Sequence, residues 1–184
     1  MRTASPLIRA AQAAESGPAL RLARHTAAEL AAPHTAAELA GLLDLLHAQR
    51  PRIETVTVGH GRDRASAAAA KAFAEAWTSA GKHVLAVVDW PEEAASWLRP
   101  ARRFVAGDPD AWVVAATALG WAQMSRRLRH STTWQPAKTF AFASIARSVT
   151  LAGPGTLQGV RGVAADGGVW EIGRNLITSH EERA

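Results

Sequence analysis

The glycines and cations that follow the first expected strand are the sharpest candidates for chemistry in this sequence. Gly59, His60 and Gly61 come directly after a short β-branched run, and Arg62 and Arg64 follow them. Two glycines let a main chain approach a ligand closely, and guanidinium groups attract phosphate or carboxylate. A dinucleotide-binding fingerprint requires a third glycine where Arg64 stands. The pattern therefore predicts a tight turn, with an anion-binding or nucleotide-binding loop as the alternative.

Three further expected strands end in side chains that can contact a ligand. Asp89 and Trp90 end the second strand, Thr117 follows the third, and Ser144 follows the fourth. In an open parallel sheet, ligands bind at the carboxyl ends of the strands, beside helix N-termini whose free N–H groups attract polar groups. The sequence therefore predicts one ligand-binding edge, made of His60, Gly61, Arg62, Asp89, Trp90, Thr117 and Ser144.

Catalysis has less support in the residue pattern. His60 as a base or Asp89 as a perturbed acid keeps a nucleotide-binding enzyme as an alternative. Ser144 lies in Phe-Ala-Ser-Ile-Ala and lacks the Gly-x-Ser-x-Gly elbow of α/β-hydrolases. The chain has no cysteine, and His60 has no second histidine at metal-ligand spacing. We therefore assign no catalytic residue, expect no metal site and expect no cofactor.

Strands and helices are expected to alternate from residue 53 to about residue 143. Short β-branched or continuous apolar runs predict strands, and longer segments with helical spacing of apolar residues predict helices. This alternation predicts a parallel sheet with right-handed crossovers. The strands are expected at residues 53–58, 84–88, 111–115 and 139–143, and the helices at 63–80, 92–104 and 119–130.

The two ends of the chain differ from this alternating part. Alanine- and leucine-rich helices are expected at residues 18–32 and 35–49, and Asp166-Gly167-Gly168 predicts a hairpin near the C-terminus. The expected organisation is a helical arm at 1–50, a Rossmann-like α/β domain at 51–178 and a tail at 179–184. The predicted fold is a three-layer α-β-α arrangement with a mainly parallel sheet of about four to six strands.

The composition bounds the partners. With 184 residues, 48% of them hydrophobic, the chain is long enough for one domain with a sizeable core. Its formal net charge of +5 permits anionic partners but is modest for a nucleic-acid-binding protein, so nucleic acid is not expected. No stretch is apolar enough to span a bilayer, and the N-terminal residues do not form a signal peptide, so a cytoplasmic location is expected for the chain as written.

Seven tryptophans are many for this length. Four of them lie within expected helices and strands and are predicted to be core. Trp90, Trp134 and Trp170 lie at or near expected loops, where amphipathic rings serve as ligand platforms or partner contacts. The alternative for these three is that they cap the core.

Residues 52–172 resemble one lobe of the type 1 periplasmic-binding-protein fold, which includes the solute-binding receptors of ABC importers for branched-chain amino acids. The strand, helix and strand that open the second lobe of that family resemble PRIETVTVGHGRDRASAAAAKAFAEAWTSAGKHVLAVVDW. The strand, helix, strand and return that follow resemble GDPDAWVVAAT, GWAQMSRRLRH, KTFAFAS and LAGPGTLQGVRGV. The resemblance implies a non-catalytic binding domain with ligand contacts at His60, Arg62, Asp89, Trp90, Thr117 and Ser144.

The chain departs from that family because two alanine-rich helices stand where a first lobe would be. We expect a fragment, a domain that works alone, or a second chain that supplies the missing half. This favours a homodimer or a partner chain, and an extracytoplasmic location if the chain is a fragment of an exported receptor. Three hypotheses follow: a domain that binds a small polar or anionic ligand, a protein-interaction or dimerisation domain without a ligand, and a nucleotide-binding enzyme.

Overall fold

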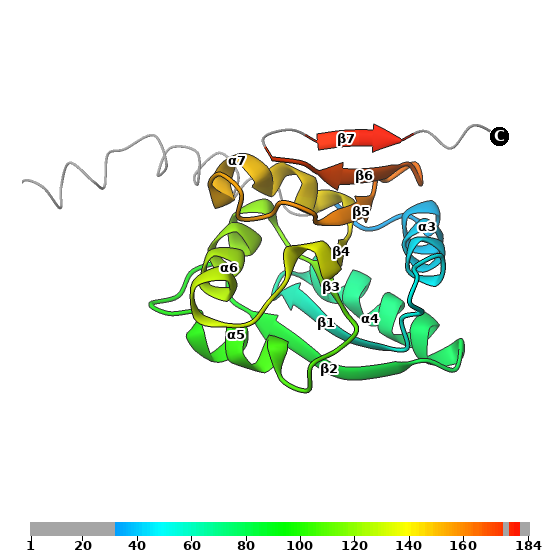
Figure 1. Cartoon of the computed structure of the whole chain (residues 1–184), viewed down its shortest axis with the longest axis horizontal. Coiled ribbons are helices and arrows are strands. Elements are labelled where there is room, and N and C mark those ends of the chain that lie inside the picture. Colours follow the sequence, from blue (N-terminus) through cyan, green and yellow to red (C-terminus); the bar gives the residue numbers. More distant parts are fainter. Residues whose placement is uncertain (1–31, 175–176, 181–184) are drawn as a thin grey trace, which may run out of the picture. The chain divides into compact units, whose positions relative to one another are not determined.

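The computed structural model describes residues 32–174 and 177–180, which form alternating strands and helices followed by a hairpin (Figure 1). The helix predicted at residues 18–32 lies outside the described residues except for its last position. The helices and 3-10 helices are α3 (Ala36–His47), α4 (Arg64–Ser79), α5 (Leu98–Val105), α6 (Ala118–Ser131), η1 (Pro136–Lys138), η2 (Ala143–Ser148) and α7 (Val149–Ala152). The strands are β1 (Thr55–Gly61), β2 (His83–Trp90), β3 (Ala111–Ala115), β4 (Thr139–Ala141), β5 (Arg161–Val163), β6 (Val169–Ile172) and β7 (Ile177–His180).

The described strands form one seven-stranded sheet in the order β2-β1-β3-β4-β5-β6-β7. The five strands from β2 to β5 in this order run parallel, and β6 and β7 are antiparallel additions. This confirms the α/β class, the mainly parallel sheet and the C-terminal hairpin of β5 and β6. The sheet has one strand more than the expected maximum of six, because β7 pairs with β6 at residues that the sequence assigns partly to a polar tail.

Helices cover both faces of the sheet, which gives the predicted three layers (Figure 1). The β3 run of five buried residues explains why the sequence shows no alternation there, since successive side chains enter opposite cores. The core under α3 and α4 includes Leu42, Leu46, Val56, Val58, Phe73, Trp77, Val113 and Phe140. The core under α5, α6 and α7 includes Val88, Trp90, Phe104, Trp112, Val114, Trp121, Met124 and Trp134.

Helix α3 belongs to the α/β core and not to the separate helical arm that the sequence predicts at residues 1–50. Its Leu42 and Leu46 side chains are fully buried against strand residues. Thr35 and Glu38 form a capping box at its start. Glu38 also accepts a 2.6 Å hydrogen bond from the main-chain N–H of Ala143, which ties the helix start to η2. These contacts hold α3 on the sheet.

The prediction that Gly59-His60-Gly61 breaks the first strand is wrong, because β1 continues through all three residues. At Gly59 a Cβ atom would lie 2.5 Å from the Phe104 ring and 2.6 Å from the Trp90 ring. Glycine is therefore needed at position 59 so that two core aromatic rings can reach the sheet. This close approach serves packing and not a ligand.

Candidate ligand site at the carboxyl ends of the strands

The parallel register brings the ends of β1, β2 and β3 to one edge, as the sequence predicts. His60 lies opposite Asp89 of β2 on one side and Ala115 of β3 on the other. Thr117 and Ser144 follow directly after β3 and β4, so they lie at the same end of the sheet. The ligand role of these residues stays a prediction.

Trp90 points into the core and is unsuited to serve as a ligand platform. Its side chain is 0% exposed and packs against Phe104 and Trp121, with ring centroids 6.1 and 5.8 Å away. Trp134 and Trp170 are also buried, at 3% and 4% exposure. For all three tryptophans near expected loops, the alternative that they cap the core holds.

Arg62 and Asp89 neutralise each other across the ends of β1 and β2. The Arg62 Nε and Asp89 Oδ2 atoms are 2.6 Å apart, and the two side chains are 62% and 39% exposed. The hydrogen bond from Arg62 lowers the pKa of Asp89, partly opposed by desolvation. An exposed pair of this kind stabilises a protein little.

His60 and Ser144 make hydrogen bonds with main-chain carbonyl groups. The Nδ1 atom of His60 is 2.7 Å from the carbonyl oxygen of Gly61, and Ser144 donates from Oγ to the carbonyl of Ala116 at 2.7 Å. A nucleophile or a general base requires a partner side chain that activates or orients it. The described contacts of these two residues supply a structural tie and no catalytic pair.

A pair of acids that the sequence analysis did not single out lies at the centre of this edge. Asp63 is the N-cap of α4 and accepts a 2.9 Å hydrogen bond from the Ser66 main-chain N–H through Oδ1. Glu92, two residues after β2, accepts a short hydrogen bond from the Thr117 hydroxyl through Oε2. The other oxygens, Asp63 Oδ2 and Glu92 Oε1, are buried and have no hydrogen-bond partner among the described residues.

The two unpartnered oxygens face the same point. A Cβ atom built on Gly61 would lie 2.9 Å from Asp63 Oδ2 and 2.9 Å from Glu92 Oε1. Burial raises the pKa of Glu92, and the nearby negative charge of Asp63 raises it further. The Thr117 hydroxyl and the Gly120 main-chain N–H oppose this rise. A buried acceptor without a donor is costly, so this pair suits a cationic N–H group.

The chain's own carboxylates occupy the helix N-termini at this edge. Asp63 caps α4, and Glu92 lies at the start of α6, beside Thr117 and Gly120. A helix N-terminus attracts anions because its first N–H groups lack partners inside the helix. Here Asp63 and Glu92 supply those anions. The edge therefore offers hydrogen-bond acceptors at its centre, and the expected cradle for an anionic ligand has no support there.

A signal for the acid pair exists in the sequence, but it is weak. Asp63 and Thr117 are good N-cap types, and each follows closely after an expected strand. Their meeting with Glu92 depends on the path of residues 91–97, which contain no helix or strand. Apolar periodicity carries no information about such a path, so the pair could not be assigned from the residues alone.

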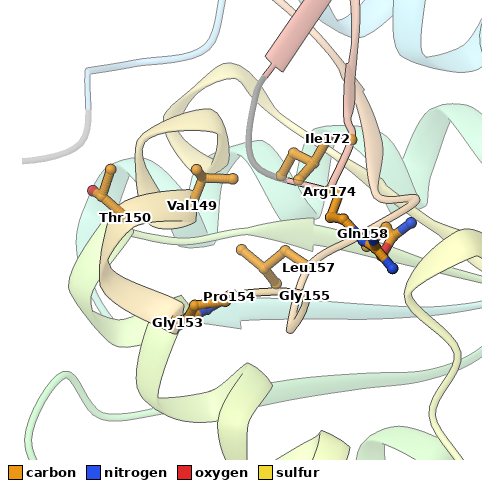
Figure 2. A pocket seen from close by; sticks show the side chains of 10 residues that line it. Val149, Thr150, Gly153, Pro154, Gly155, Leu157, Gln158, Ile172 and Arg174 are labelled. Atoms are coloured by element: carbon orange, nitrogen blue, oxygen red, sulfur yellow. The ribbon is translucent and has the colours of Figure 1, made fainter.

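A surface pocket of about 210 Å³ lies away from this edge, between α7, the segment that follows it and the end of β6 (Figure 2). None of the predicted ligand residues lines it. Its walls are mainly apolar or glycine, with Thr150, Gln158 and Arg174 as the polar members.

Among the described residues, no group of three or more His, Cys, Asp and Glu side chains is arranged to hold a metal ion. No described helix is both long and apolar enough to cross a bilayer.

Comparison with solved structures identifies the fold as one lobe of periplasmic ligand-binding receptors. A substrate-binding periplasmic protein from Ralstonia solanacearum is similar with a TM-score of 0.59 and 17% identity, over 71% of this chain and 36% of that one. A branched-chain amino acid ABC transporter periplasmic ligand-binding protein from Burkholderia xenovorans is similar with a TM-score of 0.54 and 16% identity, over 67% and 34%. An extracellular ligand-binding receptor from Rhodopseudomonas palustris is similar with a TM-score of 0.56 and 18% identity, over 68% and 34%.

These similarities confirm the predicted fold resemblance and set its extent. The chain spans about a third of the length of each receptor, which corresponds to a single lobe. At this level of identity the likeness concerns the fold, and the ligand of the receptors does not transfer with it. No family model matches the sequence, and no curated protein matches it.

Proposed function

We propose that the carboxyl-end edge binds a small ligand through an ammonium group held by Asp63 and Glu92. The observation that carries the proposal is the pair of buried, unpartnered carboxylate oxygens that face one point beside Gly61. An ammonium group has three N–H donors and a positive charge, and it satisfies both acceptors at once. The resemblance to a periplasmic ligand-binding protein of a branched-chain amino acid transporter supports an amine-bearing ligand about the size of such an amino acid.

Entry of such a ligand requires residues 91–97 to move. Both oxygens are buried in this structure, and Glu92 lies on this segment, which has no helix or strand. A single lobe leaves one side of its ligand in water, so binding is weaker than in a two-lobe clamp. A second chain that covers the edge would complete the site.

Calorimetric titration of the whole chain with L-leucine, 3-methylbutylamine and isovalerate tests the proposal. We expect L-leucine and the amine to bind, and isovalerate, which lacks the ammonium group, to bind at least tenfold more weakly. Charge-assisted hydrogen bonds contribute about 1.5–3 kcal/mol, and about 1.4 kcal/mol corresponds to tenfold in affinity. Equal binding of isovalerate, or no binding of any of the three compounds, would contradict the proposal.

Two variants and a matched control localise the binding. Asp63→Asn and Glu92→Gln keep the shape of each side chain and remove its charge, so each is expected to weaken L-leucine binding about tenfold. Glu93→Gln changes an exposed neighbour and is expected to leave binding unchanged. Burial raises the pKa of Glu92, so titrations in buffers of different ionisation enthalpy measure whether L-leucine binding releases a proton from this carboxyl group.

A second candidate function is self-association through the β2 edge. Strand β2 is an outermost strand, and its Leu85 and Val87 side chains are 44% and 46% exposed. Proteins usually protect such edges, and an unprotected edge is a template for pairing with another chain. We propose that two copies pair along β2.

Sedimentation analysis of edge variants tests this pairing. Val87→Lys is expected to shift a dimer to monomer, because a charge on the edge strand opposes strand pairing. Ile177→Lys is the matched control, because Ile177 is 40% exposed on β7 at the opposite edge of the sheet. A monomeric wild-type chain, or equal effects of the two variants, would reject the β2 interface.

A further inference from the structure

A second pocket, of about 190 Å³, lies at the opposite end of the sheet from the candidate ligand site. It lies between the end of α3, the connection from α3 to β1 and the turn before β2. Ile53 is its apolar member and is buried at 8% exposure. The other members are all basic: His47, Arg50, Arg52 and Lys82. Two separate segments, residues 47–53 and the turn at Lys82, thus bring four basic side chains to one hollow.

The charges of this basic pocket are only partly balanced. Lys82 pairs with Glu54, with 2.6 Å between Nζ and Oε1. Arg50 donates from one guanidinium nitrogen to the carbonyls of His47 and Gln49 at 3.2 and 2.8 Å. Within the described residues, Arg52 makes no hydrogen bond or ion pair. One acid, Glu54, therefore offsets three cationic side chains, Arg50, Arg52 and Lys82.

The helix ends at this pocket explain some of the cations but not all. Cations near a helix C-terminus balance its partial negative charge, and the bond from Arg50 to the carbonyl of His47, the last residue of α3, fits that role. Asp110 lies near Glu54, but its Oδ2 accepts hydrogen bonds from the main chain of Glu54 and Thr55. Neither feature accounts for Arg52, which lies five residues beyond α3.

We propose that the basic pocket binds a phosphate group, independently of the carboxyl-end site. Two guanidinium groups and an ammonium group match a dianion with several acceptor oxygens, and a guanidinium group can bind two of those oxygens at once. The share of one water in the liquid is about 30 Å³, so the hollow has room for a phosphate group and part of its hydration shell. The shared ligand chemistry is a phosphate dianion, free or on a small molecule or lipid.

The pocket carries its own spectroscopic reporter. The His47 ring stacks on the Trp77 indole with centroids 5.2 Å apart and planes 13° apart. An anion bound beside His47 changes the field at the indole. The Trp77 indole and the Lys82 main-chain amide are therefore expected to shift together in a nitrogen-correlated NMR spectrum of the whole chain.

The test is a titration of the whole chain with inorganic phosphate and with pyrophosphate, at ionic strength held constant with sodium chloride. We expect saturable shifts confined to the residues of the basic pocket and Trp77. Arg52→Gln is expected to weaken binding at least tenfold, and Glu54→Gln to strengthen it two- to threefold by freeing Lys82. Arg99→Gln, an exposed cation on α5, is the control and is expected to leave the affinity unchanged.

Sedimentation with vesicles identifies the source of the phosphate group. Binding to phosphatidic acid vesicles but not to phosphatidylcholine vesicles supports a lipid headgroup, whereas saturable NMR shifts without vesicle binding support a soluble phosphate. Shifts that follow chloride equally, that spread over the surface, or that persist unchanged in Arg52→Gln would overturn the proposal. Arg52 is exposed, so its substitution leaves the fold intact, and an unchanged amide spectrum verifies this.

Discussion

The two ends of the sheet use charge in opposite ways. At the carboxyl ends, Asp63 and Glu92 lie at two helix N-termini. Each has one buried carboxylate oxygen without a hydrogen-bond partner among the described residues. At the amino ends, Arg50 and Arg52 stay exposed around a hollow. Buried charge alters protonation and stability, whereas exposed charge mainly affects which ions approach. The two ends therefore differ in what a substitution there is expected to change.

The largest expected effect on stability is at Trp90, a core residue that lies next to the carboxyl-end site. Trp90→Ala is expected to lower the free energy of unfolding by about 3–5 kcal/mol, because it leaves a cavity beside Phe104 and Trp121. Asp89→Ala, one residue earlier and half-exposed, is expected to cost at most about 1 kcal/mol. Urea denaturation followed by circular dichroism measures both. Similar losses for the two variants would place Trp90 outside the core.

The contrast between the buried Trp90 and the half-exposed Asp89 shows which parts of the fold can be predicted from the sequence. Continuous apolar runs such as β3 and the spacing on α4 and α6 predict buried elements, because burial on a sheet requires those patterns. The strand expected at residues 84–88 stops short of Trp90 because the apolar run ends at Val88, but the pairing of β2 with β1 continues to Trp90, which lies opposite Gly61. Pairing partners are distant in sequence, so the end of a strand is poorly determined by its own residues.

The same limit applies to the sites. The sheet edge follows from topology, so His60, Asp89, Thr117 and Ser144 could be placed together from the sequence. The roles of Asp63 and Glu92 depend on a loop path that no periodicity encodes. Strand β7 could not be predicted from its own residues either, because its short, mainly polar sequence forms a strand by pairing with β6.

The second-largest expected effect is on the stability of the protein at the buried acids Asp63 and Glu92. Its direction depends on pH. The pKa of Glu92 is raised in the folded state above its usual 4.5. Its stabilising contribution is therefore fully present below about pH 4.5 and is lost as the pH rises through the raised pKa. Glu92→Gln removes this loss, and its amide can donate to Asp63. We expect the variant to be more stable than the wild type at pH 7, with little difference at pH 4.

Thermal unfolding at the two pH values measures this effect, with Glu93→Gln as the exposed control. Glu92→Ala is expected to be destabilising at both pH values, because it leaves the Thr117 hydroxyl without its acceptor. Glu92→Gln thus gains stability while the proposed ammonium site loses affinity, the opposition expected of a binding residue. If the Glu92→Gln protein is less stable than the wild type at pH 7, the charge of Glu92 beside Asp63 does not destabilise the folded state.

The smallest expected effect compares one ion pair from each end of the sheet. Arg62–Asp89 and Lys82–Glu54 have the same 2.6 Å separation, but the cation is 62% exposed in the first pair and 18% exposed in the second. Exposed pairs contribute about 0.2–1 kcal/mol, and salt screens them more strongly than sheltered pairs. Lys82→Gln is therefore expected to destabilise the protein more than Arg62→Gln, and sodium chloride at about 1 M should diminish the effect of Arg62→Gln more. Because phosphate is expected to bind beside Lys82, adding it should enlarge the loss for Lys82→Gln and leave that for Arg62→Gln unchanged. Thermal unfolding with and without phosphate measures this difference, and an equal response of both variants would remove the distinction between the two ends.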